Sequence, residues 1–251
     1  MEDVNFPCSE ELVNEFRSRG FVLVREAMTG RVVDQIRSDL ERFLEGAARQ
    51  MAGREINLTS DGQINSIHNL EKFEWSRLLL EHKSLRTFAA HLLGSEVEDF
   101  GAELFAKPSG TGIPVPDHQD DFYWCISNGQ ALTMWFALSP SDEASGAVHY
   151  FPGSHLAGLK EHAPSGVPGS SQKISDWAGI SHLKPEVVVL NPGDCVVHHA
   201  RTVHGSGTNE SGHPRIGLTI RFKSMQSLVD EERQERYLSD LKRQIEARMQ
   251  A

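Results

Sequence analysis

The chain has 251 residues, of which 39% are hydrophobic and 24% charged, as in an ordinary soluble protein with its own core. These values exclude a wholly disordered chain, a collagen-like chain and a membrane bundle. The 25 Lys and Arg residues are outnumbered by 35 Asp and Glu, the formal net charge is −10, and no basic run is present. We therefore expect neither nucleic acid nor an anionic membrane surface as a partner.

The cysteines and the first residues of the chain bear on its compartment. Cys8, Cys125 and Cys195 form no C-x-x-C pair, and their odd number argues against a disulfide framework. The first twenty residues carry several acids and no apolar run. No segment reaches the roughly 18 consecutive apolar residues of a membrane span. We expect a cytoplasmic protein without a secretory signal.

Three helices are predicted in the first third of the chain. Ser9 is expected to cap the first helix, which ends at Gly20, and residues 21–24 resemble a short β segment. Thr29 is expected to cap the second helix, and residues 84–93 form the third. The apolar stripe of the second helix comprises Val32, Val33, Ile36, Leu40, Phe43 and Leu44.

From about residue 95, short apolar runs alternate with turn signals such as the PSGTG, FPGSH and NPGD segments. The runs are residues 103–107, 131–138, 147–151, 187–190, 195–199 and 216–222. This spacing predicts a mainly β fold with flanking α, an antiparallel sandwich or jelly roll.

We expect one domain in three parts: residues 1–95 as mostly helical support with a pocket loop, 96–225 as the jelly-roll core, and 226–251 as a C-terminal helix. The last segment has apolar residues at helical spacing, namely Tyr237, Leu238, Leu241, Ile245 and Met249. That stripe packs either on the domain or on a second subunit, so the chain is expected to be a monomer or a homodimer.

The histidines and one carboxylate suggest a metal site. In a strand, His118 and Asp120 would point to the same side and offer a nitrogen and an oxygen to one ion. His204 follows 86 residues after His118. Two histidines and a carboxylate leave three open positions, as in the facial triads of non-haem Fe(II) oxygenases. His198 and His199 are rivals for the third ligand, or one of them supports the site by a hydrogen bond.

A cationic residue lies where a 2-oxo acid would need one. Arg215 comes 11 residues after His204, on the next predicted strand. Its planar fork can bind the distal carboxylate of the acid, and the Ser206 hydroxyl can bind the same group. Arg221, six residues further along the strand, is expected to form a surface salt bridge.

The segments HQDDFYW, ALTMWFALSPSDEASGAVHYFPGSH, NPGDCVVHHARTVHGSGTN and HPRIGLTIRF resemble the phytanoyl-CoA dioxygenase family. Members of that family are Fe(II)- and 2-oxoglutarate-dependent oxygenases with a double-stranded β-helix core. The resemblance covers roughly residues 105–222. It implies His118, Asp120 and His204 as iron ligands and Arg215 and Ser206 as the clamp on 2-oxoglutarate. It also suggests Gln119 and Thr133 as further cosubstrate contacts, with Trp124 and Trp135 as pocket walls.

The resemblance also narrows the chemistry. Halogenating members replace the metal carboxylate by a small residue, whereas this chain keeps Asp120, so hydroxylation, desaturation or ring closure is expected. The implied cofactors are Fe(II), 2-oxoglutarate and O2, with ascorbate as a support for activity in vitro. The expected substrate is a small molecule of a biosynthetic or sugar-type tailoring reaction, and the acidic balance favours a neutral or cationic one. A metal-dependent hydrolase or isomerase and a non-catalytic jelly-roll binding protein are the alternatives.

Substrate contacts are expected from Trp124 and from loops around the pocket mouth. Residues 57–75 show little periodicity and are predicted as a covering loop that carries Asn65 and His68. Residues 158–179 are a second candidate lid, with His162 and Trp177 as contacts. His155, in the PGSH turn, is the remaining candidate.

Overall fold

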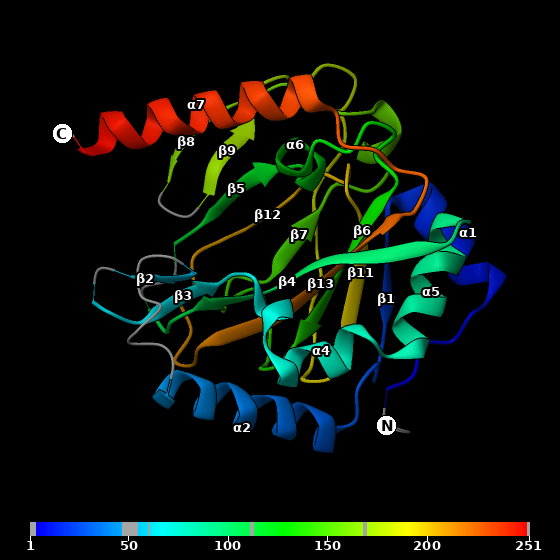
Figure 1. Ribbon diagram of the computed structural model, residues 1–251, viewed down its shortest axis with the longest axis vertical. Helices are drawn as coiled ribbons and strands as arrows, with labels where there is room; N and C mark the ends of the chain where they lie inside the picture. The colour runs from blue at the N-terminus through cyan, green and yellow to red at the C-terminus, as the bar shows by residue number, and fades with distance from the viewer. Residues whose placement is uncertain (1–3, 47–54, 60, 111–112, 168–169, 250–251) are drawn as a thin grey trace.

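The computed structural model describes residues 4–46, 55–59, 61–110, 113–167 and 170–249. Its centre is a double-stranded β-helix made of two facing sheets (Figure 1). The larger sheet contains, in spatial order, β1 (Phe21–Val24), β11 (Cys195–His199), β6 (Ala131–Ala137), β13 (Arg215–Ser224), β4 (Val97–Lys107), β3 (Ile64–Ile67) and β2 (Ile56–Leu58). The smaller sheet contains β10 (Glu186–Val187), β7 (Val148–Tyr150), β12 (His204–Ser206) and β5 (Val115–His118). The predicted mainly β fold is confirmed.

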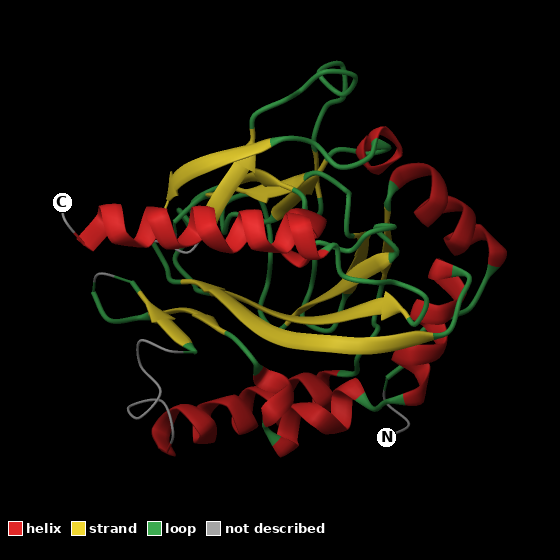
Figure 2. Ribbon diagram, turned by 45° about the horizontal axis from the view of Figure 1, so that its top comes forward, coloured by secondary structure: helices red, strands yellow, loops and turns green. Residues whose placement is uncertain are grey.

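Alternation along the strands gives the larger sheet two different faces. On β6, Leu132, Met134 and Phe136 join the main hydrophobic core, which also takes in the buried faces of the helices. Trp135, between them in sequence, packs in a second cluster with Tyr150 of the smaller sheet. Figure 2 shows helices below the long strands of the larger sheet and further strands above them. The face without the main core is therefore turned toward the smaller sheet, and it carries the polar residues of the site.

The helices on the outer face are α1 (Glu10–Arg19), α2 (Gly30–Gly46), α4 (Glu74–Leu80) and α5 (Lys83–Leu93). Ser9 accepts a hydrogen bond from the Leu12 amide, and Gly20 ends α1 in the left-handed conformation (φ 81°). Gly94 ends α5 in the same way. The three helices predicted in this region are confirmed.

Two segments predicted as loops contain strands. Residues 57–75 include most of β2, all of β3 and the short helix η1 (Leu70–Lys72), and β2 and β3 extend the larger sheet beside β4. Residues 158–179 include the hairpin of β8 (His162–Val167) and β9 (Ser170–Ile174). The strands of both hairpins are short and half-polar, and a local apolar pattern does not reveal such strands.

The C-terminal helix α7 (Glu231–Met249) contacts the short helix α6 (Asp120–Trp124). Tyr237 packs edge-on against Phe122 and Tyr123, whereas Leu238 is 53% exposed. Its first half therefore packs on the same chain, while a contact with a second subunit remains a prediction. None of the described helices combines the length and hydropathy that a membrane crossing requires.

Candidate metal centre

Three side chains converge between β5, α6 and β12. His118 ends β5, Asp120 begins α6, and His204 begins β12 directly opposite His118 in the sheet register. Their candidate ligand atoms all lie within 4.8 Å of one another. Oδ1 of Asp120 is 3.6 Å from Nε2 of His118 and 3.7 Å from Nε2 of His204. The structure thus brings together the three residues predicted as ligands.

The sequence pattern had suggested that Asp120 lies on a strand, but the structure places it at the start of helix α6. Gln119 is still extended (φ −121°, ψ 131°), and the chain turns into α6 at Asp120. The change of direction removes the strict alternation on which the strand argument depended. It also places Asp120 at the helix N-terminus, where a carboxylate is electrostatically favoured.

Backbone carbonyls fix the two histidines in one tautomer. Nδ1 of His118 lies 2.9 Å from the Pro116 carbonyl, and Nδ1 of His204 lies 2.9 Å from the Thr202 carbonyl. A carbonyl can only accept, so each Nδ1 carries the proton and each Nε2 keeps a free lone pair. Burial, with His118 nearby, also holds the pKa of His204 well below its usual value, so His204 is neutral. Both rings are therefore prepared to bind a cation.

The two oxygens of Asp120 have separate partners. Oδ1 faces the two ligand histidines, while Oδ2 accepts a hydrogen bond from Thr133 Oγ1 (2.8 Å) and lies 3.0 Å from His198 Nε2. Burial alone would raise the pKa of Asp120, but the facing histidines outweigh it and hold this pKa well below its usual value. The carboxylate is therefore charged, with one oxygen held and the other directed at the ligand histidines.

The rival histidines lie outside the triad. His198 Nδ1 faces the Tyr150 hydroxyl at 3.3 Å, so both nitrogens of His198 have partners, and the ring supports Asp120. His199 points to the other face of β11, where its Nδ1 accepts from the Arg201 amide and its ring packs near Phe16. Burial lowers the pKa of His199 to about 3.

A buried arginine suits the carboxylate of a cosubstrate. Arg215 is stacked over Trp135, 5.2 Å from the ring centroid, and donates through Nη1 to the Gly146 carbonyl (2.8 Å). Its Nε is buried without a partner. Burial lowers the pKa of Arg215 to about 10, and no described acid forms an ion pair with it. An anion in this place would satisfy an orphaned donor and a buried charge.

Close packing around Trp135 depends on a glycine. A Cβ at Gly217 would overlap the Trp135 ring. The Trp135 ring thus lies over Gly217 of β13 and within 5.2 Å of the Arg215 guanidinium, and its role as a pocket wall stays a prediction. Ser206, on β12, is also buried.

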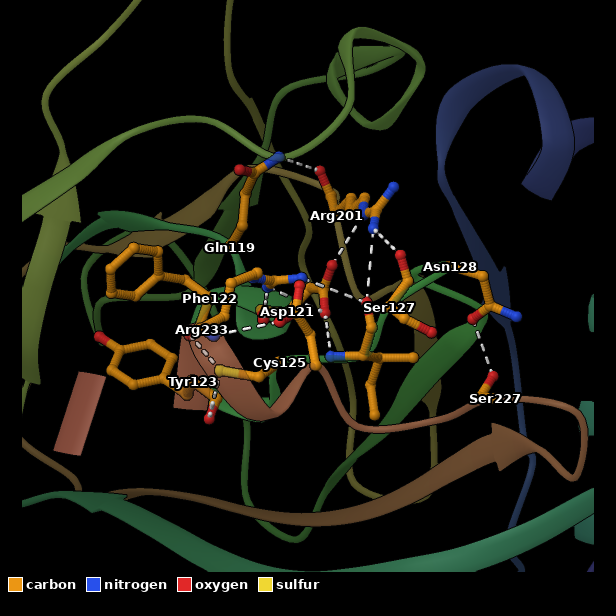
Figure 3. Close-up of polar contacts among 12 residues, drawn as sticks. Gln119, Asp121, Phe122, Tyr123, Cys125, Ser127, Asn128, Arg201, Ser227 and Arg233 are labelled. Atoms are coloured by element: carbon orange, nitrogen blue, oxygen red, sulfur yellow. Dashed lines mark hydrogen bonds and ion pairs between the residues drawn. The ribbon is translucent and has the colours of Figure 1, made fainter. Parts of the chain in front are cut away.

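Gln119 does not fit the predicted cosubstrate contact. Its Nε2 donates to the carbonyls of Gly158 and Arg201, and its Oε1 accepts from the Lys160 amide. Figure 3 shows its amide extending to Arg201, away from α6. Because Gln119 lies between two ligands on an extended segment, it points away from them, and it anchors the loop after η2 (Ser154–Ala157).

An ion pair between the buried Asp121 of α6 and Arg201 holds this helix in place (Figure 3). Asp121 is 0% exposed, and its Oδ2 accepts from Arg201 Nε at 2.7 Å. Its Oδ1 accepts from the Ile126 amide, and Arg233 of α7 donates to the Asp121 carbonyl. The segment that presents Asp120 is thereby tied to the loop before β12 and to α7.

Sequence reasoning missed a charged group beside the metal ligands. Oε1 of Glu103, on β4, lies 2.6 Å from Nδ1 of His68 and 3.5 Å from Nη2 of Arg221. Burial raises the pKa of Glu103, but His68 and Arg221 outweigh it, and the net shift is downward. Arg221 is not a surface residue: its side chain is 16% exposed, and its guanidinium lies 5.3 Å from the Phe100 ring centroid and 5.6 Å from that of Trp124. Arg221 has the same strand parity as Arg215, which the sequence already shows, but its partner Glu103 was not predicted.

The other predicted substrate contacts are dispersed. His68 is next to Glu103, and Trp124 is next to Arg221, whereas Asn65 is half-buried on β3. His155 lies against the end of α1, with Nε2 3.1 Å from the Arg17 carbonyl, and Trp177 packs on Phe151. Neither His155 nor Trp177 is brought to the metal ligands. His162 stacks on Phe122 and accepts from the Gln119 amide, so it supports α6.

Comparisons with known proteins agree with this geometry. A probable alpha-ketoglutarate-dependent hypophosphite dioxygenase of Stutzerimonas stutzeri is 24% identical over 222 residues, which are 84% of this chain and 77% of that protein. An ectoine dioxygenase of Bordetella parapertussis is 25% identical over 247 residues, 88% of this chain and 77% of that protein.

Solved structures have the same fold. The non-heme alpha ketoglutarate dependent epimerase SnoN from nogalamycin biosynthesis superposes with a TM-score of 0.70 at 26% identity, covering 87% of this chain and 84% of that one. The family model described as phytanoyl-CoA dioxygenase matches residues 16–217, most of the chain. With the facing sheets and the His-Asp-His cluster, that match shows that this chain belongs to the phytanoyl-CoA dioxygenase family.

Proposed function

We propose that His118, Asp120 and His204 bind Fe(II) and that the chain is a 2-oxoglutarate-dependent dioxygenase acting on a C–H bond of a small molecule. One observation carries the proposal: two Nε2 atoms and one Oδ1 atom face a common point while every opposite atom of the three side chains is held by a partner. Two histidines and one carboxylate occupy one face of the metal and leave three positions open.

The residues around the triad fit the cosubstrate as well as the metal. Arg215 offers an orphaned Nε and an uncompensated charge to the distal carboxylate of 2-oxoglutarate, and Ser206 is the second proposed contact. Thr133 and His198 hold Asp120, and Trp135 holds Arg215 in place. When bound, iron and 2-oxoglutarate would supply the oxidation: one oxygen atom of O2 enters succinate as CO2 leaves, and the other enters the product in a hydroxylation or leaves as water in a desaturation or ring closure.

The chain's own residues then bind, orient and exclude water; none of them need act as a nucleophile. Because Asp120 is present, we propose hydroxylation, or a related desaturation or ring closure, as the outcome. A hydrolase that uses only a metal-bound water would have no use for the buried Arg215, whose Nε has no partner. We further propose that the chain is a single-domain cytoplasmic enzyme. The relatives named above are dioxygenases of small molecules, which supports a small-molecule substrate, and we propose that the reaction is a biosynthetic tailoring step.

The test is an anaerobic titration followed in the visible spectrum. Fe(II) and 2-oxoglutarate added together should give a weak metal-to-ligand charge-transfer band that neither gives alone. The variant His204→Ala, which lacks a proposed ligand, should give no band. Its matched control is His91→Ala on the exposed side of α5, which should behave as the native chain. A native protein that gives no band and binds no 2-oxoglutarate by calorimetry would refute the proposal.

A further inference from the structure

An acid and an arginine lie side by side next to the metal ligands. Glu103 of β4 and Arg221 of β13 approach to 3.5 Å, and each side chain is 16% exposed. In the sheet register Arg221 is the direct partner of Thr133, which donates a hydrogen bond to Asp120. Burial and the nearby charge of Asp120 both raise the pKa of Glu103, although His68 and Arg221 outweigh them. The pair therefore lies close to the ligand Asp120 and is not sealed from solvent.

Helix α6 and a glycine shape this place. The helix begins with Asp120, and its last residue, Trp124, lies 5.6 Å from the Arg221 guanidinium. Gly101 is the partner of Arg221 on β4, and a Cβ at Gly101 would overlap the guanidinium. Arg221 can therefore lie across β4 toward Glu103, two residues further along that strand.

The Glu103 carboxylate has one oxygen in use and one available. Nδ1 of His68 and Nη2 of Arg221 both face Oε1 of Glu103. Nδ2 of Asn57 lies 3.0 Å from Nε2 of His68, and an amide nitrogen can only donate. Nε2 of His68 therefore accepts, and its Nδ1 carries the proton that points to Glu103. Oε2 of Glu103 has no partner among the described residues.

The Arg221 guanidinium has donors without acceptors. In the part of the chain that the structure describes, no residue accepts a hydrogen bond from it, and its Nε is buried. The rings of Phe100 and Trp124 stabilise its charge but offer no acceptor oxygen. An acceptor on Glu103 and donors on Arg221 are therefore presented next to each other.

The paired charges decide which chemical group fits. A carboxylate or phosphate bound to Arg221 would lie beside the Glu103 carboxylate, and an ammonium bound to Glu103 would lie beside the guanidinium. Both arrangements bring like charges together. A neutral hydroxyl donates one hydrogen and accepts through its lone pairs, so it can use either residue. Phe105 and Trp124, both half-buried, add apolar surface for the carbon atoms of a ring.

We propose that Glu103 and Arg221 form a substrate subsite for two neighbouring hydroxyl groups on a neutral ring of the sugar or cyclitol kind. The inference rests on the proposed function, because it names the substrate class of the same metal centre. One hydroxyl donates to Oε2 of Glu103, and its neighbour accepts from Arg221. His68 is a positioning residue that holds the Glu103 carboxylate. A site built to bond hydroxyl groups discriminates strongly against analogues that lack them.

The experiment is saturation-transfer NMR near neutral pH on the protein loaded with Zn(II) and 2-oxoglutarate. The probes are trans-1,2-cyclohexanediol, cyclohexanol, the cation trans-2-aminocyclohexanol and the anion trans-2-hydroxycyclohexanecarboxylate. The native chain should bind the diol about tenfold more tightly than each of the other three, because each lacks one neutral hydroxyl. With Mn(II) in place of Zn(II), the ring protons of the bound diol should relax faster, since a paramagnetic ion acts only at short range.

Two variants test the charge argument in opposite directions. Glu103→Gln leaves the Arg221 charge unbalanced, so it should bind the diol about tenfold more weakly and the anion more tightly than the native chain. Arg221→Gln leaves Glu103 unbalanced and should bind the cation more tightly. The matched controls are Glu81→Gln and Arg77→Gln, which remove the same charges from an exposed ion pair on α4. Both should keep the native order of the four probes.

The outcomes separate this inference from the proposed function. If the native protein binds neither metal nor 2-oxoglutarate, the proposed function fails. If it binds both but prefers the cation or the anion, or if Mn(II) does not relax the diol, this inference alone fails. An unchanged order of probes in the folded variants would mean that Glu103 and Arg221 only fasten β4 to β13, which also overturns it. If Glu103→Gln does not fold, Arg221→Gln decides the matter by the same comparison.

Discussion

His198 Nε2 lies 3.0 Å from Oδ2 of Asp120, the carboxylate oxygen turned away from the two ligand histidines. The other nitrogen of His198 faces the Tyr150 hydroxyl, whose pKa burial raises well above its usual value, so that the hydroxyl remains a donor. Tyr150, His198 and Asp120 thus form a chain that ends at the metal centre. Such partners orient a ligand without touching the ion.

His198→Ala should therefore weaken metal binding about 10–100-fold, whereas His204→Ala should abolish it, because His204 offers a free Nε2 to the ion and His198 does not. Anaerobic calorimetry with Fe(II), or with Mn(II) as a substitute, measures both affinities. His199→Ala is the matched control on the opposite face of β11 and should bind metal as the native chain does. Retention of the metal in His204→Ala with its loss in His198→Ala would reverse the assignment of the third ligand.

Arg215→Ala should weaken 2-oxoglutarate binding by about 2–5 kcal/mol and leave metal binding intact, because a buried charge-assisted contact is lost. Calorimetry on the metal-loaded protein gives this difference. Arg77→Ala, which removes an exposed guanidinium on α4, should change nothing. Unchanged cosubstrate affinity in Arg215→Ala would remove it from the proposed clamp.

Sequence patterns predicted the parts of this fold and site that depend on local chemistry. The cap at Ser9, the left-handed glycines Gly20 and Gly94, and the apolar stripe of α2 each act within a few residues, so they can be recognised from the sequence alone. The ligand residues and Arg215 were predicted by their types and order.

Contacts between distant strands were not predictable in the same way. The sequence predicted residues 103–107 only as an apolar strand. Strand parity places the two charged residues of that run, Glu103 and Lys107, on the site face of β4. Charged residues in a strand are usually expected at the surface, and only the facing sheet shows that these two are inside. The hydrogen-bond partners of Gln119 were unpredictable for a related reason, since they come from segments 39 to 82 residues away.

The Glu103–His68–Arg221 group should make stability depend on acid pH. The pKa of Glu103 is lowered from its usual 4.5, so its stabilising contribution is complete above that value and is lost as the pH falls through the lowered pKa. Urea unfolding from about pH 6 to about pH 3 should therefore show a shallower loss of stability in Glu103→Gln than in the native chain. The exposed Glu81→Gln on α4 serves as the control and should follow the native curve. Parallel curves for Glu103→Gln and the native chain would contradict the assignment.

Asp121 next to the ligand Asp120 should be a determinant of stability and not of chemistry. Asp121→Asn would leave Arg201 and Arg233 near a neutral amide, and breaking a buried ion pair from one side costs about 3–5 kcal/mol. The free energy of unfolding from a denaturant titration should fall by that order, while the metal affinity of the folded fraction changes little. Asp61→Asn, in an exposed turn, provides the comparison. Because α6 carries both aspartates, full metal loss in a stably folded Asp121→Asn would mean that this ion pair sets the position of Asp120 and does not only support the helix beneath it.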